Sequence, residues 1–302
     1  MKLTMLVVSA LCMLLMSVVA ANPRGTPVSG GQVYRDLSYG QPGQRRHLLD
    51  LYVPRGDQNG QPRPVIVWIH GGAWEQGDKS HGPGAAGIRA GYAIASVNYR
   101  LSQDGPFPAQ IHDCKAAVRW LRANAQQYGL DPDRIGVWGA SAGGHLAALL
   151  GTSADAKDLE GEVGGNLEFS SRVQAVCDWF GPTDLLDNLR AIRKFDPQNA
   201  IVGKTDAISR LLGGPAFERV DLARQANPAT HVTPTTPPFL IMHGDQDQLV
   251  PLSQSQLLYK VLNAQQVEAE LVVVKGGGHG DGPFYQPEQL LRVIAFFDRH
   301  LK

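Results

Sequence analysis

The sequence has no excess of charge of either sign: its 302 residues include 28 Lys and Arg and 28 Asp and Glu. A net charge of zero gives no electrostatic reason to expect nucleic acid or an anionic membrane surface as a partner. Charged residues are few, at 19%, while apolar residues make up 43%. This balance excludes a disordered chain and is typical of a packed globular protein.

Cysteine is also scarce, with three residues, and no group of Cys and His residues has the spacing of a zinc site. We therefore expect no metal ion. Cys114 lies in a predicted helix and Cys177 in a predicted buried strand, where a free thiol behaves as a small apolar side chain. A disulfide bond between these two residues is the alternative in an exported protein.

Long apolar runs are absent except at the N-terminus. After Lys2, an apolar run ends in the small residues Ala20 and Ala21. This pattern predicts a signal peptide over residues 1–21, and hence an exported protein, periplasmic or secreted, whose single domain spans residues 22–302. A membrane anchor is the alternative. The run is slightly short for a span and no stop-transfer charges follow it, so we expect no membrane association after cleavage.

Strand-like and helical segments alternate along the rest of the chain. Short apolar runs bounded by turn residues predict buried strands at 64–69, 93–97, 134–138, 173–177, 239–242 and 271–274, after an opening hairpin of 33–40 and 46–53. Apolar residues at helical spacing predict helices at 108–128, 142–151, 251–263 and 287–301. The alternation predicts an α/β fold with a mostly parallel central sheet and helices on both faces.

Residues 185–236 interrupt this alternation. They contain no strand-like apolar run, and their sequence includes turns rich in Gly, Pro and Thr. A long excursion of this kind inside an α/β domain is often a lid or a binding element, so we expect a partial lid insertion. A surface insertion without a role at the site is the alternative.

The residues around Ser141 are typical of a catalytic nucleophile. Gly139 and Gly143 flank it in the sequence Gly-Ala-Ser-Ala-Gly, directly after one predicted strand and before a predicted helix. A nucleophile on such a sharp turn has strained backbone geometry, and glycine at both positions lets the neighbouring chains approach. Because a serine hydroxyl is a weak nucleophile at neutral pH, it needs a base.

The partners of such a serine follow in the order acid and then histidine, each after a strand. His279 is flanked by glycines after the last predicted strand and is therefore the candidate base. Asp245 and Asp247 both follow the strand that ends at Met242, and only one of them can orient His279. Asp245 is too close to the strand end to reach across, so Asp247 is the predicted acid, and Asp245 is expected to cap a turn. His243 is interpreted as structural, with hydrogen bonds at its strand end.

A glycine-containing loop follows the strand at 64–69. Its Gly71 and Gly72 expose backbone N–H groups which, together with the N–H of Ala142, can bind the negative charge of a tetrahedral intermediate. A plain turn is the alternative interpretation of the two glycines. Three aromatic residues are candidate substrate contacts, with core packing as the alternative: Trp74, Trp179 and Phe180.

These motifs resemble those of the α/β-hydrolase fold, and more narrowly those of hormone-sensitive-lipase-like carboxylesterases and secreted bacterial feruloyl and acetyl-xylan esterases. The matching segments are HGGAW at 70–74, VNYRLS at 97–102, FPAQIHDCKAAVRWLRANA at 107–125, GLDPDRIGVWGASAGGHLAALL at 129–150, DWFGPTDLL at 178–186, HGDQDQLVP at 243–251 and GGGHG at 276–280. The resemblance covers residues 45–300, nearly the whole mature chain. Ala73 stands where many relatives have a third glycine, a change that preserves the backbone N–H.

The resemblance implies a catalytic triad and a set of oxyanion donors. The triad is Ser141, Asp247 and His279, and the donors are the N–H groups of Gly72, Ala73 and Ala142. We therefore expect a serine carboxylesterase without a cofactor, which hydrolyses short-chain or aryl esters through an acyl-enzyme intermediate. The substrate is a small-molecule or polysaccharide-linked ester, of the feruloyl or acetyl type that the resemblance implies.

The absence of a clearly apolar lid helix in residues 185–236 favours short acyl chains over triglycerides. A prolyl-oligopeptidase-like peptidase is one alternative, but its propeller domain needs far more chain. A non-catalytic binding protein on a hydrolase fold is another. Such proteins usually lack a triad residue, whereas this sequence has all three.

Overall fold

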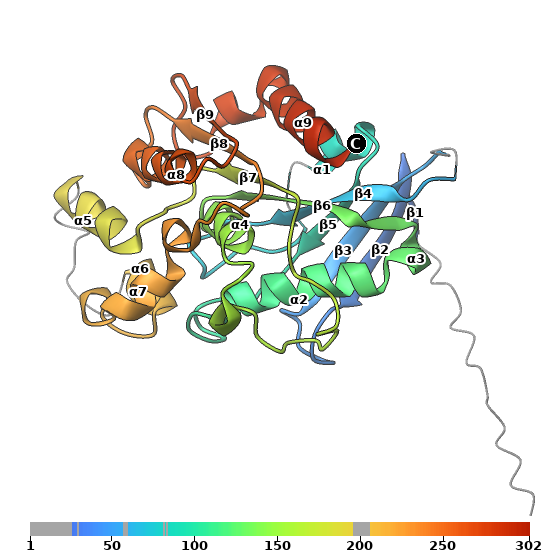
Figure 1. Cartoon of the computed structure of the whole chain (residues 1–302), viewed down its shortest axis with the longest axis horizontal. Coiled ribbons are helices and arrows are strands. Elements are labelled where there is room, and N and C mark those ends of the chain that lie inside the picture. Colours follow the sequence, from blue (N-terminus) through green and yellow to red (C-terminus); the bar gives the residue numbers. More distant parts are fainter. Residues whose placement is uncertain (1–25, 29, 57–59, 81, 83, 196–205) are drawn as a thin grey trace, which may run out of the picture.

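A nine-stranded sheet runs through the part of the chain that the computed structural model describes, residues 26–28, 30–56, 60–80, 82, 84–195 and 206–302 (Figure 1). Its strands lie in the order β1-β2-β3-β5-β4-β6-β7-β8-β9. In chain order, β1 to β9 span Thr26–Val28, Gly31–Ser38, Leu48–Pro54, Arg63–Ile69, Ala93–Val97, Leu130–Ala140, Ala175–Trp179, Phe239–Gly244 and Ala269–Val274. The predicted signal peptide, residues 1–21, lies outside the described residues.

The pairing of the strands is antiparallel at one side of the sheet and parallel elsewhere. β2 pairs antiparallel with β1 and β3, and β3 pairs antiparallel with β5. Every further pair in the described sheet is parallel. The predicted hairpin and mostly parallel sheet are therefore confirmed, and each predicted strand overlaps an observed one. β1 is too short, at three residues, for its sequence to show a pattern.

Helices cover both faces of the sheet (Figure 1). In chain order, α1 to α9 span Gly84–Arg89, Ala109–Ala123, Ala125–Tyr128, Ala142–Thr152, Leu185–Phe195, Ala207–Leu211, Val220–Ala226, Leu252–Ala264 and Pro287–Leu301. The helix predicted over 108–128 is interrupted, because the side-chain amide of Asn124 donates to the carbonyl of Trp120 at 2.8 Å and caps the end of α2. None of the described helices is long and apolar enough to cross a membrane.

Alternating side chains of the strands divide the core into two clusters. On β4, Val65 and Val67 face the cluster covered by α2, α4 and α8, while Ile66 and Trp68 face the cluster covered by α1 and α9. Burial on both faces explains why these strands are continuous apolar runs. The two cysteines fall on opposite sides of this division, since Cys114 belongs to the first cluster and Cys177 to the second. Both thiols are free and buried.

The described part of residues 185–236, namely 185–195 and 206–236, forms a group of short helices beyond the carboxyl end of β7. As expected, this part contains no strand, and it holds α5, α6 and α7 with two 3₁₀ turns. Also as expected, no helix in this described part is clearly apolar, but α5 is amphipathic. Leu185 and Leu189 are buried and Ile192 is half-buried, which gives α5 an apolar face at helical spacing. Charged residues between these positions disguise the face in the sequence.

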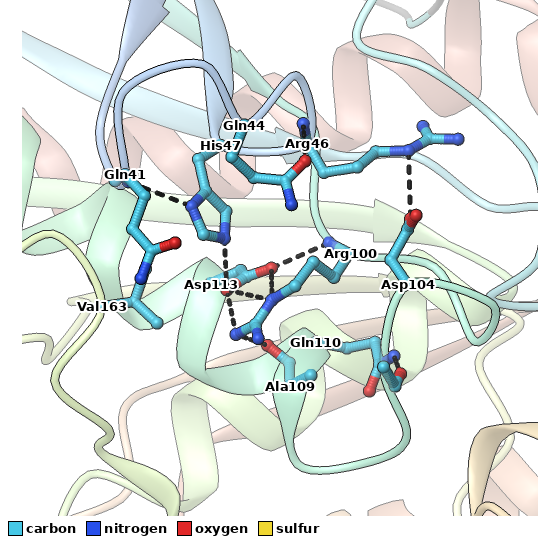
Figure 2. Close-up of polar contacts among 12 residues, drawn as sticks. Gln41, Gln44, Arg46, His47, Arg100, Asp104, Ala109, Gln110, Asp113 and Val163 are labelled. Atoms are coloured by element: carbon cyan, nitrogen blue, oxygen red, sulfur yellow. Dashed lines mark hydrogen bonds and ion pairs between the residues drawn. The ribbon is translucent and has the colours of Figure 1, made fainter.

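A buried ionic network connects the antiparallel hairpin to α2 (Figure 2). The guanidinium of Arg100 binds the carboxylate of Asp113 through two contacts, with Nη2 at 2.7 Å from Oδ1 and Nε at 2.9 Å from Oδ2. His47 Nε2 lies 3.2 Å from Asp113 Oδ1. Because the backbone N–H of Gln41 donates to His47 Nδ1, the ring proton belongs on Nε2, facing the carboxylate.

The same network supports the loop that follows β4. Arg100 begins the turn whose Ser102 N–H donates to the carbonyl of Trp74 at 2.8 Å. Asp113 therefore fixes the segment that begins at Arg100, and this segment in turn holds Trp74 at the end of the glycine-containing loop. An ionic group this deeply buried is expensive to leave without its partner.

We predict that Asp113→Ala lowers the free energy of unfolding by about 3–5 kcal/mol, because Arg100 and His47 would lose the carboxylate that they enclose. Asp155→Ala is the matched control, since the carboxylate of Asp155 pairs with Arg172 at the exposed surface and its loss should cost at most about 1 kcal/mol. Urea denaturation followed by circular dichroism measures both values. Equal losses in the two variants would contradict this role of the network.

Candidate active site

Ser141 lies on a sharp turn between β6 and α4. Its backbone has φ 56° and ψ −122°, in the left-handed half of the map where a residue with a Cβ is strained. A Cβ on Gly139 would lie 2.1 Å from the carbonyl oxygen of Gly143, and a Cβ on Gly143 would lie 2.1 Å from that of Ile69. Glycine is thus required at both positions, and the turn raises the Ser141 hydroxyl at the edge of the sheet.

His279 connects the serine to a carboxylate. Its Nε2 lies 2.8 Å from Ser141 Oγ, and its Nδ1 lies 2.7 Å from Asp247 Oδ2. Because an ionised carboxylate only accepts, Nδ1 carries the proton and Nε2 is free to accept from the serine hydroxyl. The three residues follow β6, β8 and β9, whose carboxyl ends meet at one edge of the parallel sheet.

The side chain of Asp247 is fully buried and surrounded by donors. Its Oδ1 accepts the N–H groups of Leu249 and Val250, both at 2.9 Å, and its Oδ2 lies 3.3 Å from His243 Nε2. Burial alone raises the pKa of Asp247, but the hydrogen bonds from His243 and His279 outweigh it and hold the pKa below its usual range. Asp247 therefore stays ionised beside His279.

Two neighbouring side chains hold structural positions, as the sequence predicts. Asp245 Oδ1 accepts the N–H of Gly276 at 2.8 Å and so fastens the start of the loop that carries His279. His243 is buried, with Nδ1 2.6 Å from Ser255 Oγ and Nε2 2.8 Å from the Val250 carbonyl. The structure thus brings Asp247, and not Asp245, to His279.

The loop after β4 has an unusual backbone. Gly72, Ala73 and Trp74 have φ values of 112°, 53° and 58°, three consecutive residues in the left-handed region. No described residue accepts a hydrogen bond from the N–H of Gly72 or Ala73. The N–H of Ala142 is also free of helical partners, because Ala142 is the first residue of α4. Gly71 packs against the serine turn, where a Cβ would lie 2.8 Å from the Ala140 carbonyl oxygen.

His145 supports this loop from inside the protein, a role that its sequence context does not reveal. It accepts the indole N–H of Trp74 on Nδ1 at 3.2 Å and contacts the carbonyl of Ala226 through Nε2 at 2.8 Å. Burial lowers the pKa of His145 to about 4, so the ring is neutral near pH 7 and its Nδ1 can accept the indole N–H. Trp74 is thereby held at the wall of the site.

A cavity of about 280 Å³ opens beside Ser141 and His279. Ala73, Trp74 and Ala142 line it on the side of the glycine-containing loop. The opposite wall is mostly apolar and comes from the helices of the 185–236 excursion and from the loop after β8: Leu189, Ile192, Ile208, Leu249 and Val250. Sequence reasoning misses this wall because its residues have no motif and are far apart along the chain.

Two of the three predicted aromatic contacts are not at the cavity. Trp179 is fully buried on the α9 side of β7, where its indole N–H points at Met242 Sδ, 3.1 Å away. Phe180 is 3% exposed and packs its ring edge-on against His279, with 4.8 Å between ring centroids. Alternation along β7 sends Trp179 to the core, and Phe180 supports the histidine instead of contacting a substrate. Of the three, only Trp74 lines the cavity.

Comparison with known proteins points to one family. Residues 49–262 match the BD-FAE family. The Mycobacterium tuberculosis protein named esterase LipC is 32% identical over 238 residues, which cover 77% of this chain and 56% of LipC. This chain spans about half the length of LipC and of the curated relatives LipQ and LipM, which it also matches.

Solved structures of similar fold carry related names. A truncated carbohydrate esterase from gut microbiota superimposes with a TM-score of 0.80 at 32% identity, over 91% of this chain and 99% of that one. An acetyl ester-xyloside bifunctional hydrolase from Caldicellulosiruptor lactoaceticus gives a TM-score of 0.66 at 25% identity, over 83% of this chain and 88% of that one. The chain has the α/β-hydrolase fold that these proteins share.

Asp245 and Asp247 have different partners in the structure, so substitution of each should have a different effect on the rate. We predict that Asp247→Asn lowers kcat by about ten-thousand-fold, because an amide in place of the carboxylate no longer stabilises the charged imidazole or fixes its tautomer. Asp245→Asn is the matched control, since its amide oxygen can still accept the N–H of Gly276 and the rate should stay near that of the unmodified protein. Rates on p-nitrophenyl acetate, with folding checked by circular dichroism, measure both. A dead Asp245→Asn beside an active Asp247→Asn would refute the assignment.

Proposed function

The chain belongs to the BD-FAE family, and on this premise we propose that it is a serine carboxylesterase. The observation that carries the proposal is the hydrogen-bonded chain from Ser141 through His279 to Asp247, which opens on a cavity with free backbone donors. The esterase names of its relatives support the same reaction, and neither a peptidase nor a non-catalytic binding protein is favoured by them.

The first half of the reaction forms an acyl-enzyme. Ser141 Oγ attacks the ester carbonyl carbon while its proton passes to His279 Nε2. The carbonyl oxygen becomes an oxyanion, which the N–H groups of Gly72, Ala73 and Ala142 bind. The intermediate then collapses: the bond to the alcohol breaks, His279 gives its proton to the departing alcohol oxygen, and the acyl group stays on Ser141.

The second half reverses these steps with water. His279 accepts a proton from a water molecule, whose oxygen attacks the acyl carbon, and a second oxyanion forms at the same donors. Collapse releases the carboxylic acid and returns the proton to Ser141. Asp247 remains ionised throughout and stabilises the charged His279 in both halves.

The shape of the cavity supports a substrate with a short acyl chain. A cavity of about 280 Å³ bounded by Leu189, Ile192 and Ile208 has room for roughly nine non-hydrogen atoms at about 30 Å³ each, which the acyl and alcohol parts of the ester must share. The names of the carbohydrate esterase and of the acetyl ester-xyloside hydrolase add acetylated carbohydrate as a candidate natural ester, and a feruloyl or other aryl ester is the second candidate. Two expectations from the sequence also belong to this proposal: export directed by residues 1–21, and a lid formed by residues 185–236.

We predict that kcat/KM on p-nitrophenyl esters falls by about tenfold or more between butyrate and decanoate, because a longer acyl chain does not fit within the space that the apolar wall bounds. Ile208→Ala should shift the optimum to longer chains by removing part of that wall. A panel of p-nitrophenyl esters, methyl ferulate and acetylated xylan measures the preference. A higher rate on long-chain triglycerides than on acetate or butyrate esters would contradict the proposed substrate class.

A further inference from the structure

The first turn of α5 is fixed more firmly than a surface helix requires. Asp184 caps it by accepting the N–H groups of Leu186 and Asp187, both at 3.0 Å. The buried side chain of Gln254 accepts the N–H groups of Thr183 and Asp184 just before it. The positions of the side chains on this turn are therefore set before any substrate arrives.

Asn188, on this turn, is one of two polar residues on this side of the cavity; the other, Asp206, caps α6 by accepting the N–H of Ser209. Asn188 lies next to Leu189 and four residues before Ile192, so the three share one face of α5, and all three line the cavity beside Ser141. Asn188 is 3% exposed. Among the described residues, its Oδ1 has no hydrogen-bond partner and no side-chain hydrogen bond involves its Nδ2.

An amide in this state is unfavourable unless something else pairs with it. Burying a polar group without a hydrogen bond destabilises a fold, and buried amides are nearly always satisfied. Several buried polar groups around the site are paired, as with His145, His243 and Gln254. Among the described residues Asp178 Oδ2 and Thr183 Oγ1 also lack a partner, but neither residue lines the cavity. Asn188 differs in that it lines the cavity that a substrate would fill.

We propose that Asn188 is a substrate-binding residue whose amide hydrogen-bonds a hydroxyl group that the ester carries close to its carbonyl. The hydroxyl can belong to the acyl part or to the alcohol part of the ester, and a hydroxyl suits an amide because both groups donate and accept. A site built around such a group discriminates strongly against the analogue that lacks the hydroxyl, since the amide is then left unpaired. This inference rests on the proposed esterase function.

Matched pairs of esters test the proposal. p-Nitrophenyl 3-hydroxybutyrate against p-nitrophenyl butyrate places the hydroxyl on the acyl part, and 2-hydroxyethyl acetate against ethyl acetate places it on the alcohol part. The unmodified protein should prefer the hydroxylated ester in one pair by about tenfold or more in kcat/KM. Asn188→Leu should abolish that preference while kcat/KM on the plain ester stays equal or rises, and Asn188→Ser should retain part of it.

Two controls distinguish substrate binding from a structural role. Arg190→Ala alters an exposed residue of the same helix and should keep the preference. The Tm of Asn188→Leu should equal or exceed that of the unmodified protein, because leucine removes an unpaired buried amide. If neither pair shows a preference, or if Asn188→Leu lowers both members of a pair equally, the inference is overturned while the esterase function stands. An unmodified protein that hydrolyses none of the four esters overturns the proposed function and this inference with it.

Discussion

The backbone of Ser141 is the constraint on which the rest of the site depends. Its φ of 56° is maintained because β6, the loop after β4 and the start of α4 approach so closely that Gly139 and Gly143 have no room for a side chain. A hydrogen bond also fixes the turn, because the N–H of Ser141 donates to the carbonyl of Trp179 on β7 at 2.8 Å. The same turn leaves the Ala142 N–H free at the start of a helix, so one local conformation places both the nucleophile and a donor for the charge that it creates.

Burial and hydrogen bonding determine which of the titratable groups around this turn are charged. His145 is buried, with a pKa lowered to about 4, and its neutral ring can hold Trp74 as an acceptor. Asp247 has a pKa below its usual range because His243 and His279 donate to it, and it remains an anion beside the base. Burial also raises the pKa of Asp178 to about 6, and its Oδ1 holds the N–H of Gly181 in the turn that presents Phe180 to His279. The contacts of His145 need a neutral ring and those of Asp247 a charged carboxylate, and burial and hydrogen bonding produce these two states.

The sequence predicts the strands and the catalytic candidates well, because both leave local signals. Strands buried on two faces are continuous apolar runs, and the turn at Ser141 needs glycine at fixed positions. The distinction between Asp245 and Asp247 also follows from chain length after β8, and the hydrogen bond to His279 agrees with it. Contacts made across the fold leave no such signal. The apolar wall, the network around Asp113 and the burial of Trp179 depend on which elements pack together, and the spacing of residues along the chain does not encode them.

The central claim is that Ser141 is a nucleophile activated by His279 at the edge of the sheet. Labelling with a fluorophosphonate probe, followed by mass spectrometry of the intact protein and its peptides, tests it most directly. We expect one adduct per chain, on the peptide that contains Ser141, and a labelling rate lower by several orders of magnitude in His279→Ala, because the serine would have no base. Absence of an adduct, an adduct at another residue, or equally fast labelling of His279→Ala would contradict it.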